Sequence, residues 1–188
     1  MQSGHTAAYR RARGGDFEAA AALFNRHHPS NLATGQERDG FISALFSAEQ
    51  LRDMNDSLCV IVALLGNDIV GSLCCSDRAF PAQPPPYRAM QRQFATWHYR
   101  GRPLSEWRAF AYGPVCIDGT ARGQGILKGL FAAALPFVRL RFELATAFIA
   151  RANQRSLAAH TRQLGMEPVG AFTLDGQDYL ALAVSVQA

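Results

Sequence analysis

The chain has 188 residues, of which 48% are hydrophobic and 18% are charged. This length and composition are typical of one globular domain, residues 1–188, and argue against a disordered or fibrous protein. The net charge is +4, but the sequence has no basic run of the nucleic-acid-binding type and no apolar stretch long enough to span a membrane. We therefore expect the protein to bind neither nucleic acid nor a membrane.

The N-terminal part predicts a strand followed by two helices. Residues 7–12 are compatible with a short strand that ends at a pair of glycines. Asp16 is placed to cap a helix over 17–26, because apolar residues recur there at helical spacing. Residues 41–51 show the same spacing and predict a second helix.

A hairpin and a long insert are predicted next. Two apolar runs, 58–65 and 69–75, flank a Gly-Asn-Asp turn and indicate paired strands. Residues 77–108, called the insert below, are rich in proline, arginine and aromatic side chains and could carry one helix, over 87–98. A segment of this length without regular structure is usually functional or disordered.

The centre of the sequence combines a strand, a glycine-containing turn and a helix. An apolar run over 109–117 precedes the turn, and a helical pattern over 126–140 follows it. This order directs the free N–H groups of a helix N-terminus at an anion, and Gly123 and Gly125 allow close approach to it. The dinucleotide fingerprint would need glycine at Lys128, and the P-loop motif is absent. The stretch therefore predicts a site for a pyrophosphate-sized ligand of another kind.

The C-terminal third predicts a strand, a helix and a closing hairpin. Pro136 should kink or restart the helix before it. The apolar run 144–150 is a buried strand, and 153–164 is a helix that Gly165 ends. An Asp-Gly turn joins two further strands within 168–186.

The turn resembles the acetyl-CoA-binding motif of the GNAT superfamily of N-acetyltransferases. That motif reads Arg/Gln-x-x-Gly-x-Gly/Ala, and Arg122 and Gly125 take its first and fourth positions. Leu127 takes the sixth and departs from the pattern.

A second block of the superfamily lies on the following helix. Its pattern is Asn-x-x-Ala/Ser-x-x-x-Tyr, and Asn153, Ser156 and His160 occupy the corresponding positions. His160 thus replaces the tyrosine, and one extra residue separates it from the glycine that follows the helix.

The resemblance implies the fold. The order of the predicted elements matches the superfamily along nearly the whole chain, with the insert as the unmatched part. It implies an α/β (α+β) protein whose mixed, mostly antiparallel sheet of about six to seven strands is flanked by helices, with a splayed parallel strand pair in the middle. Gly113 and Pro114 fall where the superfamily has an irregular strand.

The resemblance also implies a function: transfer of an acetyl group from acetyl-CoA to a primary amine by direct attack, through a tetrahedral intermediate and without a metal. A backbone N–H near Val115 or Cys116 would stabilise the oxyanion. His160 would act as general acid, because an imidazole near its ordinary pKa can hold a proton at neutral pH. The residues implied to bind the cosubstrate are Val115, Cys116, Ile117, Arg122, Gly123, Gln124, Gly125, Ile126, Leu127, Asn153, Ser156 and His160.

Several roles stay open. The general base could be Asp118, Glu106 or a chain of waters. Phe41 and Phe46 face either the substrate or the core. The insert supplies either acceptor specificity or the surface of a homodimer. The acceptor itself is expected to be a small amine, with a protein N-terminus or lysine as the alternative, and the arginines of the insert favour one that carries a carboxylate or phosphate.

The four cysteines lie in apolar runs without metal spacing, so we expect buried, reduced thiols. Cys116 comes at the end of the strand that would meet the thioester, and a nucleophilic role is its alternative. The first residues show no apolar signal core, which favours a cytoplasmic protein. The rival function is a non-catalytic acyl-CoA-binding or regulatory module on the same fold.

Overall fold

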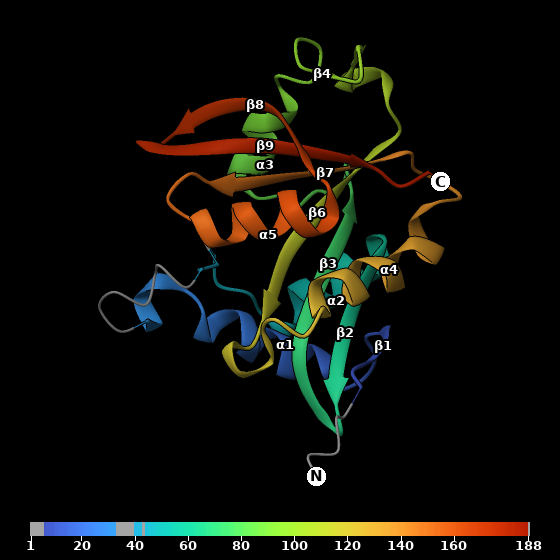
Figure 1. Ribbon diagram of the computed structural model, residues 1–188, viewed down its shortest axis with the longest axis vertical. Helices are drawn as coiled ribbons and strands as arrows, with labels where there is room; N and C mark the ends of the chain where they lie inside the picture. The colour runs from blue at the N-terminus through green and yellow to red at the C-terminus, as the bar shows by residue number, and fades with distance from the viewer. Residues whose placement is uncertain (1–5, 33–39, 43, 188) are drawn as a thin grey trace.

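A seven-stranded sheet forms the middle of the molecule, and helices cover both of its faces (Figure 1). The computed structural model describes residues 6–32, 40–42 and 44–187. The strand order is β1-β2-β3-β6-β7-β9-β8. The bounds of these strands are β1 Ala8–Arg11, β2 Cys59–Leu65, β3 Asp68–Asp77, β6 Ala109–Ile117, β7 Leu144–Ala150, β8 Glu167–Leu174 and β9 Gln177–Ser185.

The helices divide between the two faces. Figure 1 shows α1 (Asp16–Arg26), α2 (Ala48–Ser57) and α3 (Pro85–Gln91) on one face, and α4 (Ile126–Val138) and α5 (Gln154–Leu164) on the other. Strand β2 is apolar throughout because its alternate side chains pack into the two cores on opposite faces of the sheet. Within the part of the chain that the structure describes, no helix is long and apolar enough to cross a membrane.

Strands β6 and β7 pair only at one end. Their parallel pairing covers Ala109–Ala111 against Leu144–Thr146 and then stops. On its other edge, β6 pairs with β3 so that Leu73 faces Val115 but Cys75 faces Tyr112, which leaves one extra residue on β6. This bulge contains Gly113, with φ 112, and Pro114, which has no N–H to donate. The predicted fold, with its splayed strand pair, is therefore confirmed.

Two details of the N-terminal helices differ from the prediction. Gly15, and not Asp16, is the N-cap of α1, and the Asp16 carboxylate accepts from the Arg13 N–H and pairs with Arg10. The helix predicted over 41–51 is wrong in its start, because α2 begins only at Ala48. Ser47 begins that helix with a capping box: its hydroxyl accepts from the Gln50 N–H, and the Gln50 side chain accepts from the Ser47 N–H.

The other expected elements are found with few changes. Helix α4 does not restart at Pro136, which lies within it two residues before its end. The Asp175-Gly176 turn joins β8 to β9, and Gly165, with φ 67, ends α5. All four cysteines are buried and free of disulfides.

The insert is built into the core. Its helix, α3, is shorter and earlier than the expected 87–98, and a small hairpin of β4 (His98–Tyr99) and β5 (Arg102–Pro103) follows. The Tyr87 hydroxyl lies 2.8 Å from Thr146 Oγ1, and the Tyr99 hydroxyl accepts from the Ser185 N–H. These bonds tie the insert to β7 and β9, so it is part of what holds the C-terminal half of the sheet.

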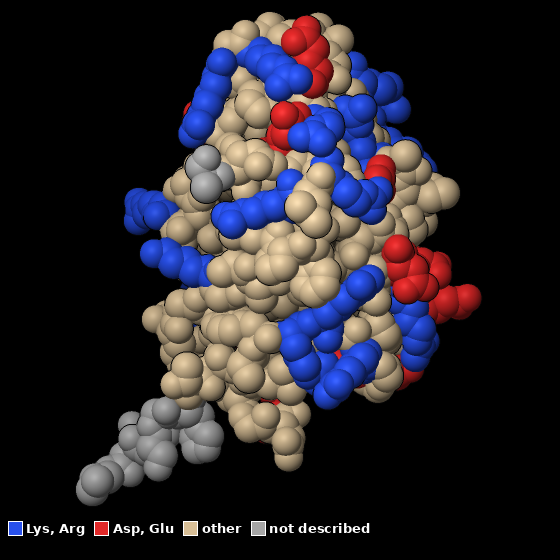
Figure 2. Space-filling view, turned by 90° about the vertical axis from the view of Figure 1, so that its right-hand side faces the viewer, with Lys and Arg blue, Asp and Glu red and all other residues tan. Residues whose placement is uncertain are grey.

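Three of the six arginines of the insert form ion pairs with glutamates. Arg102 and Arg108 pair with Glu143, and Arg100 pairs with Glu167. Figure 2 shows Lys and Arg side chains broken up by acidic and uncharged ones on this face of the molecule. The positive net charge thus does not form a continuous basic surface there.

Substitution of Gly170 is expected to loosen the insert. A Cβ at Gly170 would overlap the indole of Trp97, so Gly170→Ala forces that ring off β8. We expect a loss of about 1–3 kcal/mol in the free energy of unfolding, or roughly 2–12 °C in Tm, measured by thermal denaturation. Gly119→Ala, where no atom lies within 4 Å of the added Cβ and, as at Gly170, the backbone φ is not positive, controls for a glycine replacement as such. Equal losses in both variants would contradict the packing role of Gly170.

Candidate active site

Two adjoining cavities lie where β6 and β7 separate. One, of about 170 Å³, is bounded by the turn before α4 and is called the turn-side cavity. The other, of about 460 Å³, is bounded by residues of the insert and of α2 and is called the insert-side cavity. The residues that line both are Phe41, Ile42, Val115, Asn153, Ser156 and His160. The shared lining shows that the two cavities meet at the splayed strands.

The turn before α4 leaves a helix N-terminus open. Gly125 is the N-cap in the left-handed conformation, with φ 75, and has no side chain to cap the helix. Gly123 has φ 78, and a Cβ at either glycine would meet no atom within 4 Å. The first N–H groups of α4 have no partner within the helix, and the helix dipole adds positive potential there. Leu127, which departs from the motif, is buried and lines the turn-side cavity.

The structure brings the sequence-predicted residues together. All but Gln124 line the turn-side cavity, while the Gln124 amide donates to the Thr120 carbonyl. The Arg122 guanidinium, beside the turn, donates from Nε to the Ile117 carbonyl at 3.2 Å. The residues that sequence reasoning missed are His27, Gly40, Ile42, Ala121, Arg155, Ala159 and Gln163.

A helical period could have found part of that missed set. Arg155, Ala159 and Gln163 follow one another at intervals of four on α5, beside the stripe of Ser156 and His160, so they share a face of the helix. His27 and Gly40 reach the cavity through the path of the chain between α1 and α2, for which the sequence carries no signal.

His160 is buried at the junction of the two cavities. Its Nδ1 lies 2.7 Å from the Ser156 carbonyl, which can only accept, so Nδ1 carries the proton. Its Nε2 is therefore an acceptor, and the Tyr112 hydroxyl lies 3.3 Å away. Burial lowers the pKa of His160, although the bond to Ser156 opposes this shift. The expectation that His160 keeps an ordinary pKa and holds an acidic proton at neutral pH is therefore corrected: burial favours the neutral imidazole.

Tyr112 is the polar partner that sequence reasoning missed. Burial raises the pKa of Tyr112 well above its ordinary value, so its hydroxyl is protonated and can donate to His160 Nε2. Tyr112 comes from β6, 48 residues before His160, and lines the insert-side cavity. No local sequence pattern joins the two residues, since the pair forms only when α5 packs against β6.

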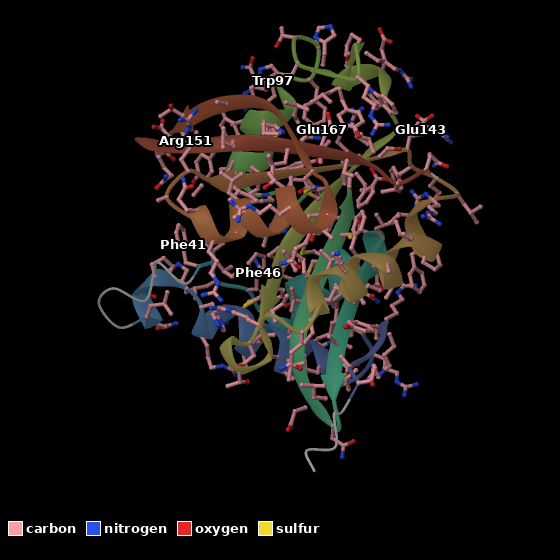
Figure 3. All side chains as sticks on the ribbon, viewed as in Figure 1. Phe41, Phe46, Trp97, Glu143, Arg151 and Glu167 are labelled. Atoms are coloured by element: carbon pink, nitrogen blue, oxygen red, sulfur yellow. The ribbon has the colours of Figure 1, made fainter. Side chains whose placement is uncertain are left out.

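Residues 40–42 and 44–46, the described part of the chain just before α2, line the site on one side. Phe41 and Phe46 come from this segment and lie between α5 and α1 in the view of Figure 3. Both line the insert-side cavity, so both face it, while Phe46 also packs on the Phe24 ring at 5.5 Å. Asn153 Nδ2 donates to the Phe41 carbonyl at 3.0 Å, and its Oδ1 accepts from the Ser156 N–H at 3.2 Å. Asn153 thus both caps α5 and holds the segment.

Loss of the Asn153 side chain is expected to act on stability and on the segment together. Asn153→Ala removes an N-cap and should cost about 1 kcal/mol of unfolding free energy. Proteolysis near residues 40–42 should also become faster, because the bond to the Phe41 carbonyl is lost. Asn153→Asp keeps the oxygen that caps α5 but not the amide donor. It should therefore be as stable as the wild type but as sensitive to proteolysis near residues 40–42 as Asn153→Ala. Equal protection in Asn153→Ala and the wild type would show that the segment is held by other contacts.

The other candidate catalytic groups are one cysteine and two carboxylates. Burial raises the pKa of Cys116 to about 12, so it is a thiol at neutral pH and does not suit a nucleophile. The Thr120 hydroxyl and N–H lower the pKa of Asp118, which also lies 3.7 Å from Arg26. Glu106 is exposed beside Arg102. Neither carboxylate lines either cavity. Among the described residues, no cluster of three or more His, Cys, Asp or Glu side chains could hold a metal.

Comparison with known proteins rests on structure. No family model and no curated protein matches the sequence. An N-acetyltransferase from Staphylococcus aureus Mu50 has a similar structure, with a TM-score of 0.62 and 14% identity over 97% of this chain and 99% of that one. The ribosomal-protein-S18-alanine N-acetyltransferase from Escherichia coli gives a TM-score of 0.62 and 10% identity over 97% and 96%.

A third similar structure carries the name of the superfamily. It is an acetyltransferase assigned to the GNAT family, from Desulfovibrio desulfuricans, with a TM-score of 0.62 and 16% identity over 97% of this chain and 100% of that one. The chain therefore has the fold of the GNAT N-acetyltransferases, as its sequence motifs implied.

Proposed function

We propose that the protein is an N-acetyltransferase that transfers an acetyl group from acetyl-CoA to a primary amine. The observation that carries the proposal is the pair of cavities that meet between β6 and β7, one of them ending at an uncapped helix N-terminus. Such an arrangement suits two substrates that approach from opposite sides and react at the junction.

The turn-side cavity fits the cosubstrate. Backbone N–H groups of Ile126, Leu127 and Lys128 suit a pyrophosphate, and Arg122 adds a positive charge beside them. Among the described residues, the edge of β6 that faces β7 has no strand partner beyond Ala111, so backbone groups near Val115 can bond an extended chain of amides, while the Ile117 carbonyl already accepts from Arg122 Nε. Acetyl-CoA, when bound, supplies the activated acetyl group as a thioester.

The Tyr112–His160 pair suits proton transfer better than a charged histidine would. An attacking amine must be neutral, so a proton has to leave the ammonium that predominates at neutral pH. The Tyr112 hydroxyl can take that proton as it gives its own to His160 Nε2, which is the free basic nitrogen. The same proton can later pass to the thiolate that leaves. His160 is thus proposed as the base of a relay, with Tyr112 as its donor.

The proposal is tested by calorimetric titration with acetyl-CoA and CoA, together with release of free thiol in the presence of amines. Micromolar binding and thiol release that one class of amine accelerates would support the transferase. Binding without acceleration by any amine would favour the non-catalytic acyl-CoA-binding module. Absence of binding would overturn both, because both depend on the turn before α4.

A further inference from the structure

The lining of the insert-side cavity indicates which amine the enzyme accepts. At about 460 Å³, this cavity has the size of a small-molecule site. Most of its wall is apolar, and the aromatic side chains in it come from four parts of the chain: the segment before α2, the insert, β6 and β7. They are Phe41, Phe46, Phe80, Tyr87, Tyr112 and Phe148. Such a wall favours an apolar and preferably aromatic body in the ligand.

The charged side chain in the described lining of the same cavity is positive. Arg88, on α3, is the only Arg or Lys among the described residues that line it, and none of those residues is Asp or Glu. No hydrogen bond or ion pair within the described part of the chain engages the exposed Arg88 side chain. Arg100, Arg102 and Arg108, in contrast, are paired with glutamates. Arg88 is therefore the insert arginine at this cavity whose charge is left for a ligand.

We propose that the acceptor is a small amine with an apolar, preferably aromatic body and one carboxylate, and that Arg88 selects it through the carboxylate. A planar guanidinium matches a carboxylate with two parallel hydrogen bonds. None of the described residues of the wall is a carboxylate that could pair with the additional ammonium groups of a polyamine, and burying such groups unpaired is unfavourable. This inference rests on the proposed acetyl transfer and adds the substrate class.

The test compares amines that differ by one feature at a time. Thiol release from acetyl-CoA is measured with L-phenylalanine, 2-phenylethylamine, L-alanine and spermidine. We expect kcat/KM to be highest for L-phenylalanine and about tenfold lower once either the carboxylate or the ring is missing. Spermidine should give the slowest reaction.

Variants of α3 assign the carboxylate preference to Arg88. Arg88→Gln should lower kcat/KM for L-phenylalanine about tenfold and leave that for 2-phenylethylamine unchanged. Arg92→Gln is the matched control, because Arg92 is an exposed arginine next to the same helix that lines neither cavity. It should behave as the wild type with both amines.

The outcomes separate this inference from the proposed function. If acetyl-CoA binds but spermidine is preferred, or no aromatic amino acid accelerates thiol release, the acceptor class is wrong and the cosubstrate site stands. If Arg88→Gln slows both aromatic amines equally, Arg88 does not read the carboxylate. If acetyl-CoA itself does not bind, the proposed function fails first.

Discussion

Gly125→Glu is expected to weaken acetyl-CoA binding by about 30- to 1000-fold. The new carboxylate would lie at the open N-terminus of α4, where the proposed pyrophosphate binds, and two like charges about 4 Å apart repel by roughly 2–4 kcal/mol at a protein surface. The side chain would also fill space that the glycine leaves empty. Calorimetric titration with acetyl-CoA measures the effect directly.

Gly176→Glu is the control for this variant. Gly176 has φ 76, nearly the same as the 75 of Gly125, and a Cβ at either position meets no atom within 4 Å. Both substitutions therefore carry the same backbone strain and the same added charge, but Gly176 lies in the turn between β8 and β9, outside both cavities. Normal binding by Gly125→Glu, or equal loss in both variants, would contradict the placement of the pyrophosphate at this turn.

The parts of the fold that the sequence predicts well are those with strong local signals. The glycine turn before α4 and the end of α5 at Gly165 could be predicted because each depends on residues within one turn of the chain. The bulge of β6 was visible because Pro114 cannot donate in a ladder. The separation of β6 from β7, at which the site lies, was implied only by the resemblance to the superfamily.

The remaining features depend on contacts between distant residues. Apolar spacing over 41–51 suggested a helix, but the Phe46 N–H and carbonyl are both bonded to the Asn25 side chain, 21 residues earlier, and α2 begins only at Ala48. The insert looked like a loop because its partners, such as Thr146 and Ser185, lie far along the chain. The lowered pKa of His160 could not be predicted for the same reason, since its burial and its contact with Tyr112 come from the tertiary fold.

His160→Phe is expected to lower kcat by about 100- to 10,000-fold while acetyl-CoA affinity changes only a few-fold. Phenylalanine keeps a ring in the buried site but cannot accept the proton that passes through Tyr112. Tyr112→Phe removes the hydroxyl alone and should also slow the reaction. Because the two groups act in one relay, the double variant should be no slower than His160→Phe. His98→Phe, at an exposed histidine of the insert that lines neither cavity, should have the activity of the wild type.

The pH dependence of kcat distinguishes a base from an acid at His160. Burial moves the pKa of His160 below its ordinary value of 6.5, so the neutral imidazole that a base requires is present at pH 7. It is lost only as the pH falls through this lowered pKa. The wild type should therefore hold its kcat down to pH 6.5 and lose it at lower pH. A general acid at His160 would give the opposite profile, with kcat rising as the pH falls.

A second readout separates catalysis from folding. Between the lowered pKa and 6.5 the unfolded chain binds more protons at His160 than the folded chain does, so the stability of the wild type falls as the pH drops through this window. His160→Phe removes the titrating imidazole, so the free energy of unfolding of this variant should fall less steeply with decreasing pH than that of the wild type. If kcat at low pH falls together with the folded fraction and not in a separate titration, His160 stabilises the fold and does not transfer the proton.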